Sequence, residues 1–120
     1  MMYEISQQFF FDAAHTLERK LETESSRRIH GHTYRAEVTM SGLPDPATGM
    51  VMDLGVLRQM TERVKLQLDH HFLDEVPGLG NPTLENLCRF IADDMKKQGS
   101  VLSEVRVWRQ SIGDACRLLV

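Results

Sequence analysis

Two stretches near the start of the chain alternate between apolar and polar residues, which is the period-two pattern of β-strands. Residues 3–14 begin this way and then run apolar through the three phenylalanines at 9–11, so we expect a strand that is partly buried on both faces. Residues 32–42 (HTYRAEVTMSG) alternate again and are rich in β-branched and aromatic side chains, which predicts a second strand. The segment between them, residues 17–29, is polar and charged and is expected to be a solvated loop.

Beyond a proline-containing turn (GLPDPATG), apolar residues recur at the spacing of an amphipathic helix. The pattern runs from Leu54 to Leu68. Asp53 is expected to be the N-cap, because its carboxylate can accept a free backbone N–H of the first turn. The VPGLGNP stretch then breaks the helical pattern, and a second helix is predicted to begin after the N-cap Thr83 and to end at Gly99.

Two short alternating segments at the end of the chain predict a β-hairpin. The stretches SEVRVWRQS and ACRLLV flank Ile112-Gly113-Asp114, and a glycine in this position is typical of a tight turn. The predicted order of elements is therefore ββααββ, in one domain that covers residues 1–120. We expect an α+β fold with a four-stranded antiparallel sheet and two helices on one face. Since free strand edges promote aggregation, we also expect the sheet edges to be paired between subunits.

Composition and charge narrow the class of partner. The chain has 120 residues, of which 42% are apolar and 26% charged, and its net charge is −3 with both signs mixed along it. This leaves no basic face for nucleic acid or an anionic membrane, and no apolar run approaches the length of a membrane span. The N-terminal segment carries Glu4 and Asp12 rather than a basic region, so we expect no secretory signal and a cytoplasmic location. In that compartment, Cys88 and Cys116 are expected to be free, buried thiols.

The five histidines are the main chemical feature of the sequence. His30 and His32 are two residues apart, and in a strand such residues point to the same face. His15 ends the first predicted strand, and hairpin-like pairing with the second strand would bring it to the same place. Three imidazoles with one open position form the catalytic zinc arrangement, in which a bound water or substrate group becomes more acidic. The alternative is that the HGH pair is a chance feature of a solvated strand, but the full set favours a Zn²⁺ site.

The LDHH stretch at the predicted end of the first helix is a second candidate. Asp69 can orient His70, and a carboxylate–histidine pair is a common general acid–base unit. The alternative is a charged helix end, where the helix dipole favours a protonated histidine. Beside a metal site in the same small domain, both interpretations stay open.

Several stretches, in the order in which they occur, resemble the 6-pyruvoyltetrahydropterin synthase family and most of all its bacterial 6-carboxytetrahydropterin synthase branch. These stretches are FDAAH, HGH, GMVMDL, LDHHFLDEVPGLGNPTLENL and VRVW. The resemblance runs nearly from end to end and implies a tunnelling fold (T-fold). In that fold, two ββααββ subunits join their sheets edge to edge, trimers close a barrel, and two trimers stack into a homo-hexamer. Such an assembly would pair the free strand edges.

The resemblance also implies roles for individual residues. By this resemblance, the zinc ligands are His15, His30 and His32. The proton-transfer pair is Asp69 with His70, and Thr83 matches a residue that contacts the pterin from a neighbouring subunit. Family members act on 7,8-dihydroneopterin triphosphate: zinc acidifies the side-chain hydroxyls, a base moves a proton, and triphosphate is eliminated. The bacterial branch also loses acetaldehyde and leaves a carboxylate, on the route to queuosine. The resemblance therefore implies a carbon–oxygen or carbon–carbon lyase with a small pterin-like substrate.

One departure from the family pattern concerns the catalytic base. The family places a catalytic cysteine four to six residues before the HGH motif, where this chain has Glu24, Ser25 and Ser26. A serine hydroxyl has a far higher pKa than a thiol, so Glu24 is the better candidate. Some family variants resemble this chain in using a carboxylate there. The alternative is that the stretch is only a solvated loop.

The second departure is Arg109, which stands where the family has a glutamate that holds the amino-pyrimidine edge of the pterin. A carboxylate accepts hydrogen bonds from that edge, whereas a guanidinium only donates them. If Arg109 faces the pocket, we expect a ligand that presents acceptors or a carboxylate at that edge. The alternative is that Arg109 turns outward or pairs with an acid such as Glu85 or Asp114.

Three functions remain open on this reading. The first is a zinc-dependent lyase of the pterin synthase type with a carboxylate base. The second is a divergent paralogue that keeps the fold and the zinc but acts on a different, anionic heterocycle. The third is a non-catalytic, zinc-stabilised oligomer. The pair of Asp69 and His70 favours the first two, because structure alone would not require it, and Arg109 favours the second over the first.

Overall fold

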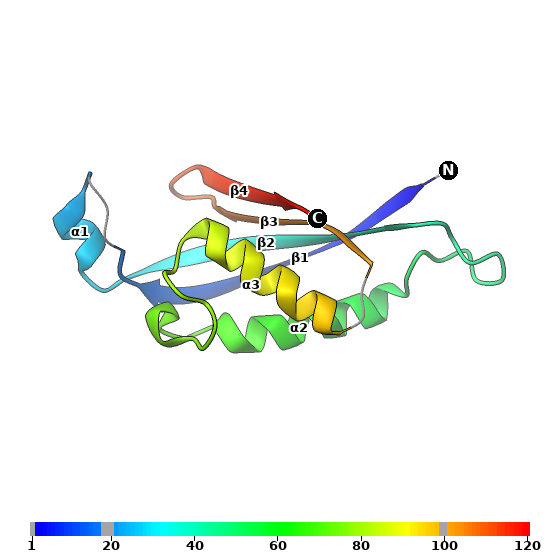
Figure 1. Ribbon diagram of the computed structural model, residues 1–120, viewed down its shortest axis with the longest axis horizontal. Coiled ribbons are helices and arrows are strands. Elements are labelled where there is room, and N and C mark those ends of the chain that lie inside the picture. Colours follow the sequence, from blue (N-terminus) through cyan, green and yellow to red (C-terminus); the bar gives the residue numbers. More distant parts are fainter. Residues whose placement is uncertain (1, 18–20, 99–100) are drawn as a thin grey trace.

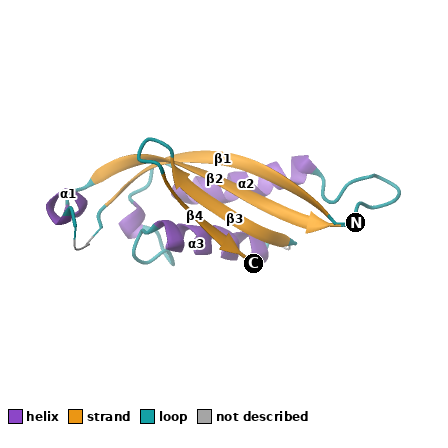
Figure 2. Ribbon diagram, turned by 90° about the horizontal axis from the view of Figure 1, so that it is seen from above, coloured by secondary structure: helices purple, strands orange, loops and turns teal. Residues whose placement is uncertain are grey.

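The computed structural model describes residues 2–17, 21–98 and 101–120 (Figure 1). Its elements, in chain order, are β1 (Tyr3–His15), α1 (Thr23–Arg27), β2 (His30–Gly42), α2 (Leu54–Leu68), the 3₁₀ turn η1 (Leu73–Glu75), α3 (Leu84–Lys97), β3 (Leu102–Arg109) and β4 (Asp114–Leu119). The four strands form one antiparallel sheet in the order β1-β2-β3-β4. The helices α2 and α3 both cover the same face of this sheet, so the predicted α+β fold is confirmed (Figure 2).

Both long helices begin where the sequence predicts. The Asp53 carboxylate accepts a hydrogen bond from the Gly55 N–H at 2.7 Å. The Thr83 hydroxyl accepts one from the Asn86 N–H at 3.1 Å. Each bond satisfies an N–H group that the first helical turn leaves unpaired, so both predicted N-caps are confirmed. The predicted end of the second helix, Gly99, lies outside the described residues.

The hydrophobic core lies between the sheet and the two helices. Buried and exposed positions alternate along the strands, and the buried rings of Phe11 and Tyr34 stack with their centroids 5.0 Å apart. These rings belong to one cluster with the apolar stripes of α2 and α3. Phe10 points away from the core and is 47% exposed, with Lys65 Nζ 4.4 Å from its ring centroid. The expected burial of the first strand on both faces is therefore wrong at Phe10.

Local features differ from the sequence predictions in three places. The segment 17–29, predicted to be a loop, contains the single-turn helix α1. The strand β2 begins at His30 rather than at residue 32, because His30 continues the antiparallel pairing with β1. The turn η1 does not follow from the sequence pattern.

Both cysteines are free as expected, but Cys116 is only half-buried whereas Cys88 is buried. None of the described helices has the length and apolarity to cross a membrane.

One end of the sheet gathers the segments that carry the candidate chemistry. The last residue of β1 pairs with the first residue of β2, His15 with His30. The last residue of β3 pairs with the first residue of β4, Arg109 with Asp114. The segment before α3 approaches the same end, because the carbonyl of Pro82 contacts the His15 ring. Strand register and helix placement therefore bring five separate parts of the chain to one location.

Candidate metal centre and active site

Three imidazoles converge at this end of the sheet. The antiparallel register places His15 opposite His30 and Ala13 opposite His32, so all three rings project from the helix-covered face. The Nε2 atom of His15 lies 2.9 Å from that of His30 and 3.1 Å from that of His32. The ligand atoms of the three residues all lie within 4.8 Å of one another. The predicted grouping of the three histidines is therefore present in the fold.

The outer ring nitrogens of two of these histidines contact backbone carbonyls. His15 Nδ1 lies 3.3 Å from the Pro82 oxygen, and His30 Nδ1 lies 2.7 Å from the Arg28 oxygen. A carbonyl oxygen only accepts, so these contacts place the ring proton on Nδ1 and leave a lone pair on Nε2. The two Nε2 atoms then face each other at 2.9 Å, an arrangement that a bound cation would stabilise.

The spacing and protonation of the cluster suit a divalent metal ion. Tetrahedral zinc with bonds of about 2.0–2.1 Å to nitrogen separates its ligand atoms by roughly 3.3 Å, which is close to the nitrogen–nitrogen distances here. Burial lowers the pKa of His15. Burial, reinforced by the nearby Arg109 charge, lowers the pKa of His32 to about 4. These imidazoles are neutral near pH 7, which is the form that binds metal.

Arg109 faces the histidine cluster and also pairs with Asp114. Its Nε donates to Asp114 Oδ1 at 3.0 Å, and its NH2 donates to the other carboxylate oxygen. Its NH1 lies 3.3 Å from His32 Nε2. Hydrogen bonds from Arg109 hold the pKa of Asp114 below its ordinary value. The two alternatives drawn from the sequence, a pocket-facing arginine and an arginine paired with Asp114, are thus both realised.

The hydroxyl of Tyr34 lies behind the cluster. Tyr34 is fully buried, and its oxygen is 3.3 Å from His15 Nδ1. It also lies close enough to the Arg109 guanidinium for the two groups to affect each other's pKa. Burial raises the pKa of Tyr34 to about 12, so the hydroxyl is neutral. One oxygen therefore contacts both a candidate metal ligand and the buried guanidinium.

Two adjoining cavities open at the cluster. One of about 330 Å³ is lined by the three histidines together with Glu22, Arg109 and Asp114. The other, of about 300 Å³, is lined by His15, Tyr34, Arg109 and the first residues of α3, including Thr83. Thr83 therefore lies beside its own chain's His15, where a ligand at the cluster can reach it without a second copy.

The sequence predicts Glu24 as the base, but among the acidic residues next to α1 it is Glu22 that lines the cavity. Glu24 lies in α1 and is exposed, and it is not among the residues that line either cavity. Ser25 is exposed and its hydroxyl donates to the Glu22 carbonyl at 3.0 Å. The side chain of Ser26 lies outside the described part of the structure. Sequence reasoning missed Glu22 because this residue lies eight residues before His30, outside the spacing of four to six residues that places the base.

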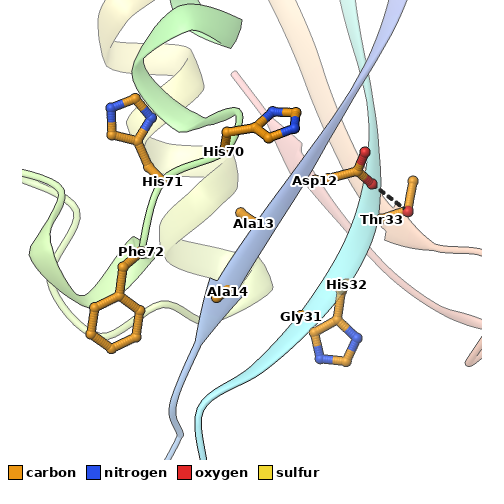
Figure 3. Close-up of a pocket in the computed structure, with 9 residues that line it drawn as sticks. All are labelled: Asp12, Ala13, Ala14, Gly31, His32, Thr33, His70, His71 and Phe72. Carbon is orange, nitrogen blue, oxygen red and sulfur yellow. Dashed lines mark hydrogen bonds between the residues drawn. The ribbon is translucent and has the colours of Figure 1, made fainter.

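The pair of Asp69 and His70 is formed, but neither residue lines the two cavities at the histidine cluster. Asp69 Oδ2 lies 3.0 Å from His70 Nδ1, and Asp69 Oδ1 accepts a hydrogen bond from the Asp12 N–H at 2.9 Å. The bond from Asp12, aided by His70, lowers the pKa of Asp69. The His70 side chain is 81% exposed. Figure 3 shows the rings of His70 and His32 apart from each other, and both residues line an open hollow of about 520 Å³.

Comparison with known proteins identifies the family. The family model described as 6-pyruvoyl tetrahydropterin synthase matches residues 4–117. A 6-pyruvoyl tetrahydrobiopterin synthase of Poecilia reticulata is 38% identical over 113 residues, which cover 81% of this chain and 77% of the relative. A 6-carboxy-5,6,7,8-tetrahydropterin synthase of Synechocystis sp. is 35% identical over 103 residues, covering 82% and 78%. A dihydroneopterin monophosphate aldolase of Pyrococcus furiosus is 32% identical over 102 residues, covering 85% and 81%.

A solved structure agrees with these relatives. The 6-pyruvoyl tetrahydropterin synthase of Caenorhabditis elegans superposes with a TM-score of 0.85 at 25% identity, covering 100% of this chain and 96% of that one. The antiparallel sheet, its helix layer and the ββααββ order are therefore those of the T-fold. With a family match over nearly its whole length, this chain belongs to the 6-pyruvoyl tetrahydropterin synthase family.

Proposed function

We propose that this protein is a zinc-dependent lyase of the 6-pyruvoyl/6-carboxytetrahydropterin synthase type that acts on 7,8-dihydroneopterin triphosphate or a related heterocycle. The observation that carries the proposal is the convergence of Nε2 atoms from His15, His30 and His32 at 2.9 and 3.1 Å. A bound zinc ion would supply Lewis acidity, which lowers the pKa of a nearby hydroxyl group. The relatives named as synthases and as an aldolase support lyase chemistry on a pterin.

The chain's own residues would then hold the substrate and move protons. The three histidines would bind the ion through Nε2, with Pro82 and Arg28 carbonyls fixing the orientation of two rings. Thr83 lines the adjoining cavity and would contact the heterocycle. A carboxylate on or beside α1 would accept the proton; Glu24 is the residue expected from the sequence, and Glu22 is the one that lines the cavity.

The pair of Asp69 and His70 would act in a neighbouring copy. Asp69 fixes the His70 ring through Nδ1, which leaves Nε2 for proton transfer. Because the His70 side chain is 81% exposed and does not line the two cavities at its own chain's cluster, it would be placed to serve a site on another subunit. This fits the homo-oligomer, a hexamer, that the free edges of β1 and β4 lead us to propose.

A second candidate function rests on Arg109. Its guanidinium lines both cavities and only donates hydrogen bonds, so a neutral pterin would lack a carboxylate to hold its amino-pyrimidine edge there. The chain would then be a divergent paralogue with a different substrate. Titration with neopterin separates the two functions: tight binding by the wild type supports the pterin lyase, and weak binding that improves in Arg109→Glu supports the paralogue.

Metal analysis of matched histidine variants tests the proposed function. The wild type is expected to bind one zinc ion per chain and to turn over 7,8-dihydroneopterin triphosphate only when zinc is present. His32→Ala should lose the metal, whereas His71→Ala should keep it, because His71 is exposed and is not in the cluster. Unchanged zinc content in His32→Ala would refute the metal assignment. Zinc binding without turnover of any dihydropterin would instead point to the divergent paralogue or to a non-catalytic, zinc-stabilised oligomer.

A further inference from the structure

The hydrogen bonds of Arg109 are arranged differently from those of an ordinary surface ion pair. The residue is 8% exposed although it carries a full charge. Two of its nitrogens, Nε and NH2, donate to the two oxygens of Asp114. Its remaining terminal nitrogen, NH1, is directed at His32 Nε2, 3.3 Å away. Asp114 therefore balances the charge and fixes the plane of the guanidinium, while NH1 reaches the histidine cluster.

The contact between Arg109 and His32 uses the same lone pair that a metal ion needs. A neutral imidazole has one acceptor nitrogen, so His32 Nε2 can accept the NH1 hydrogen or bind a metal, but not both. When a metal is bound, a buried N–H of Arg109 loses its acceptor next to the ion. An unsatisfied buried donor is costly, and for a charged group the cost is larger. Another acceptor must therefore take the place of His32 Nε2.

We propose that Arg109 is a specificity-determining residue that, together with the metal, binds a carboxylate or phosphate oxygen of the ligand. An anionic oxygen between the ion and NH1 satisfies the donor that His32 releases. The anionic oxygen also offsets the charge of the metal ion. Asp114 does not do this, because its carboxylate already balances the guanidinium of Arg109. Asp114 is then a positioning residue that holds the guanidinium plane toward the cluster.

The other charged residues that line the two cavities lie at their rims. Glu22 and Glu85 are both exposed, so water screens their charges more than it screens the buried guanidinium. Their repulsion of an anion is therefore weaker than the attraction of Arg109 and the metal. The inference rests on the metal site of the proposed function, and it adds the chemical class of the group that the site selects.

Benzoate and benzamide are suitable probes, because they have the same shape and differ in charge. Their binding to the zinc-loaded protein is measured by calorimetry, and the cobalt-substituted protein reports through its visible spectrum whether the probe reaches the ion. In the wild type, benzoate should bind at least ~10-fold more tightly than benzamide and should change the cobalt spectrum. In Arg109→Met, benzoate affinity should fall by ~10-fold, while benzamide affinity changes by less than about threefold.

Two further variants separate the binding role of Arg109 from a general loss of charge or folding. Arg106→Met removes an arginine from the same strand, but its guanidinium packs over the Trp108 ring on the opposite face, so benzoate binding should not change. Arg109→Lys keeps the charge and loses the planar fork, so benzoate binding should be intermediate. Asp114→Asn should weaken benzoate binding only by loosening the guanidinium, so Arg109→Met should weaken it less in that background than in the wild type.

The outcomes distinguish this inference from the proposed function. Metal uptake with equal affinities for benzoate and benzamide, or an equal loss of benzoate affinity in Arg106→Met and Arg109→Met, overturns the inference and leaves the metal site intact. A protein that takes up no zinc or cobalt overturns both. A charge preference that disappears in Arg109→Met, in a variant that still folds and holds its metal, supports the role of Arg109.

Discussion

Removal of a single oxygen tests how the core supports the candidate site. In Tyr34→Phe the ring remains stacked on Phe11, so the packing of the core is kept. The lost hydroxyl lies 3.3 Å from His15 Nδ1 and beside the Arg109 guanidinium. His15 Nδ1 still has the Pro82 carbonyl, and Arg109 still has Asp114, so the loss is confined to one acceptor for a buried, charged donor.

The expected size of this effect follows from that contact. A buried donor left without its acceptor costs about 1–3 kcal/mol, and the remaining bonds of Arg109 to Asp114 place the value in the lower part of this range, about 1–2 kcal/mol. For 120 residues the unfolding entropy is roughly 0.25 kcal/mol/K, so the melting temperature should fall by roughly 4–8 °C.

Urea and thermal unfolding of the metal-free protein, at one fixed chain concentration, measure this change. Tyr3→Phe is the matched control, because the other tyrosine is 48% exposed and its variant should stay within about 0.5 kcal/mol of the wild type. Equal effects of the two substitutions would refute the reasoning, since the hydroxyl of Tyr34 would then contribute nothing that an exposed hydroxyl does not. Retention of the wild-type melting temperature by Tyr34→Phe would have the same meaning.

The remaining predictions concern acid stability, assembly and the base. The pKa of Asp69 is lowered in the folded protein, so its contribution to stability is present above the unfolded pKa of about 4 and is lost as the pH falls through the folded pKa. The free energy of unfolding, measured with urea between pH 5 and pH 2, should therefore fall less steeply in Asp69→Asn than in the wild type. Sedimentation should show a hexamer or at least a trimer at micromolar concentration, and a stable monomer would contradict the pairing of strand edges. Replacing the true base with glutamine should lower steady-state turnover about a hundredfold or more, so a comparison of Glu22→Gln with Glu24→Gln identifies the base. Ser26→Ala should lower turnover much less. Equal losses of turnover in all three variants would indicate loop geometry instead of base chemistry.

The sequence by itself determined the four strands and the two long helices, because each of these follows from local spacing. Period-two alternation marked the strands, helical spacing marked α2 and α3, and the N-caps Asp53 and Thr83 marked where the helices begin. It also determined that His30 and His32 share a face, since residues two apart in any strand do so. These conclusions need no knowledge of which elements meet.

Only the tertiary structure decided what stands beside these residues. Period two tells on which face a side chain lies but not which residue faces it across the sheet, so the contact of His15 with His30 depends on the β1–β2 register. The same limit applies to Arg109, whose position near both Asp114 and His32 comes from two strand pairings and not from its place in the sequence.

The positions of α1 and His70 show that local sequence spacing also does not predict which candidate catalytic residues reach the site. Glu22, the N-cap of α1, lines the cavity, whereas Glu24 within α1 does not. Likewise, the bond from the Asp12 N–H to Asp69 holds the end of α2 against β1, and His70 in this position does not line the cavities at its own chain's cluster. Spacing along a sequence reports neighbours within one element, whereas a site made by several elements depends on long-range packing that local patterns do not encode.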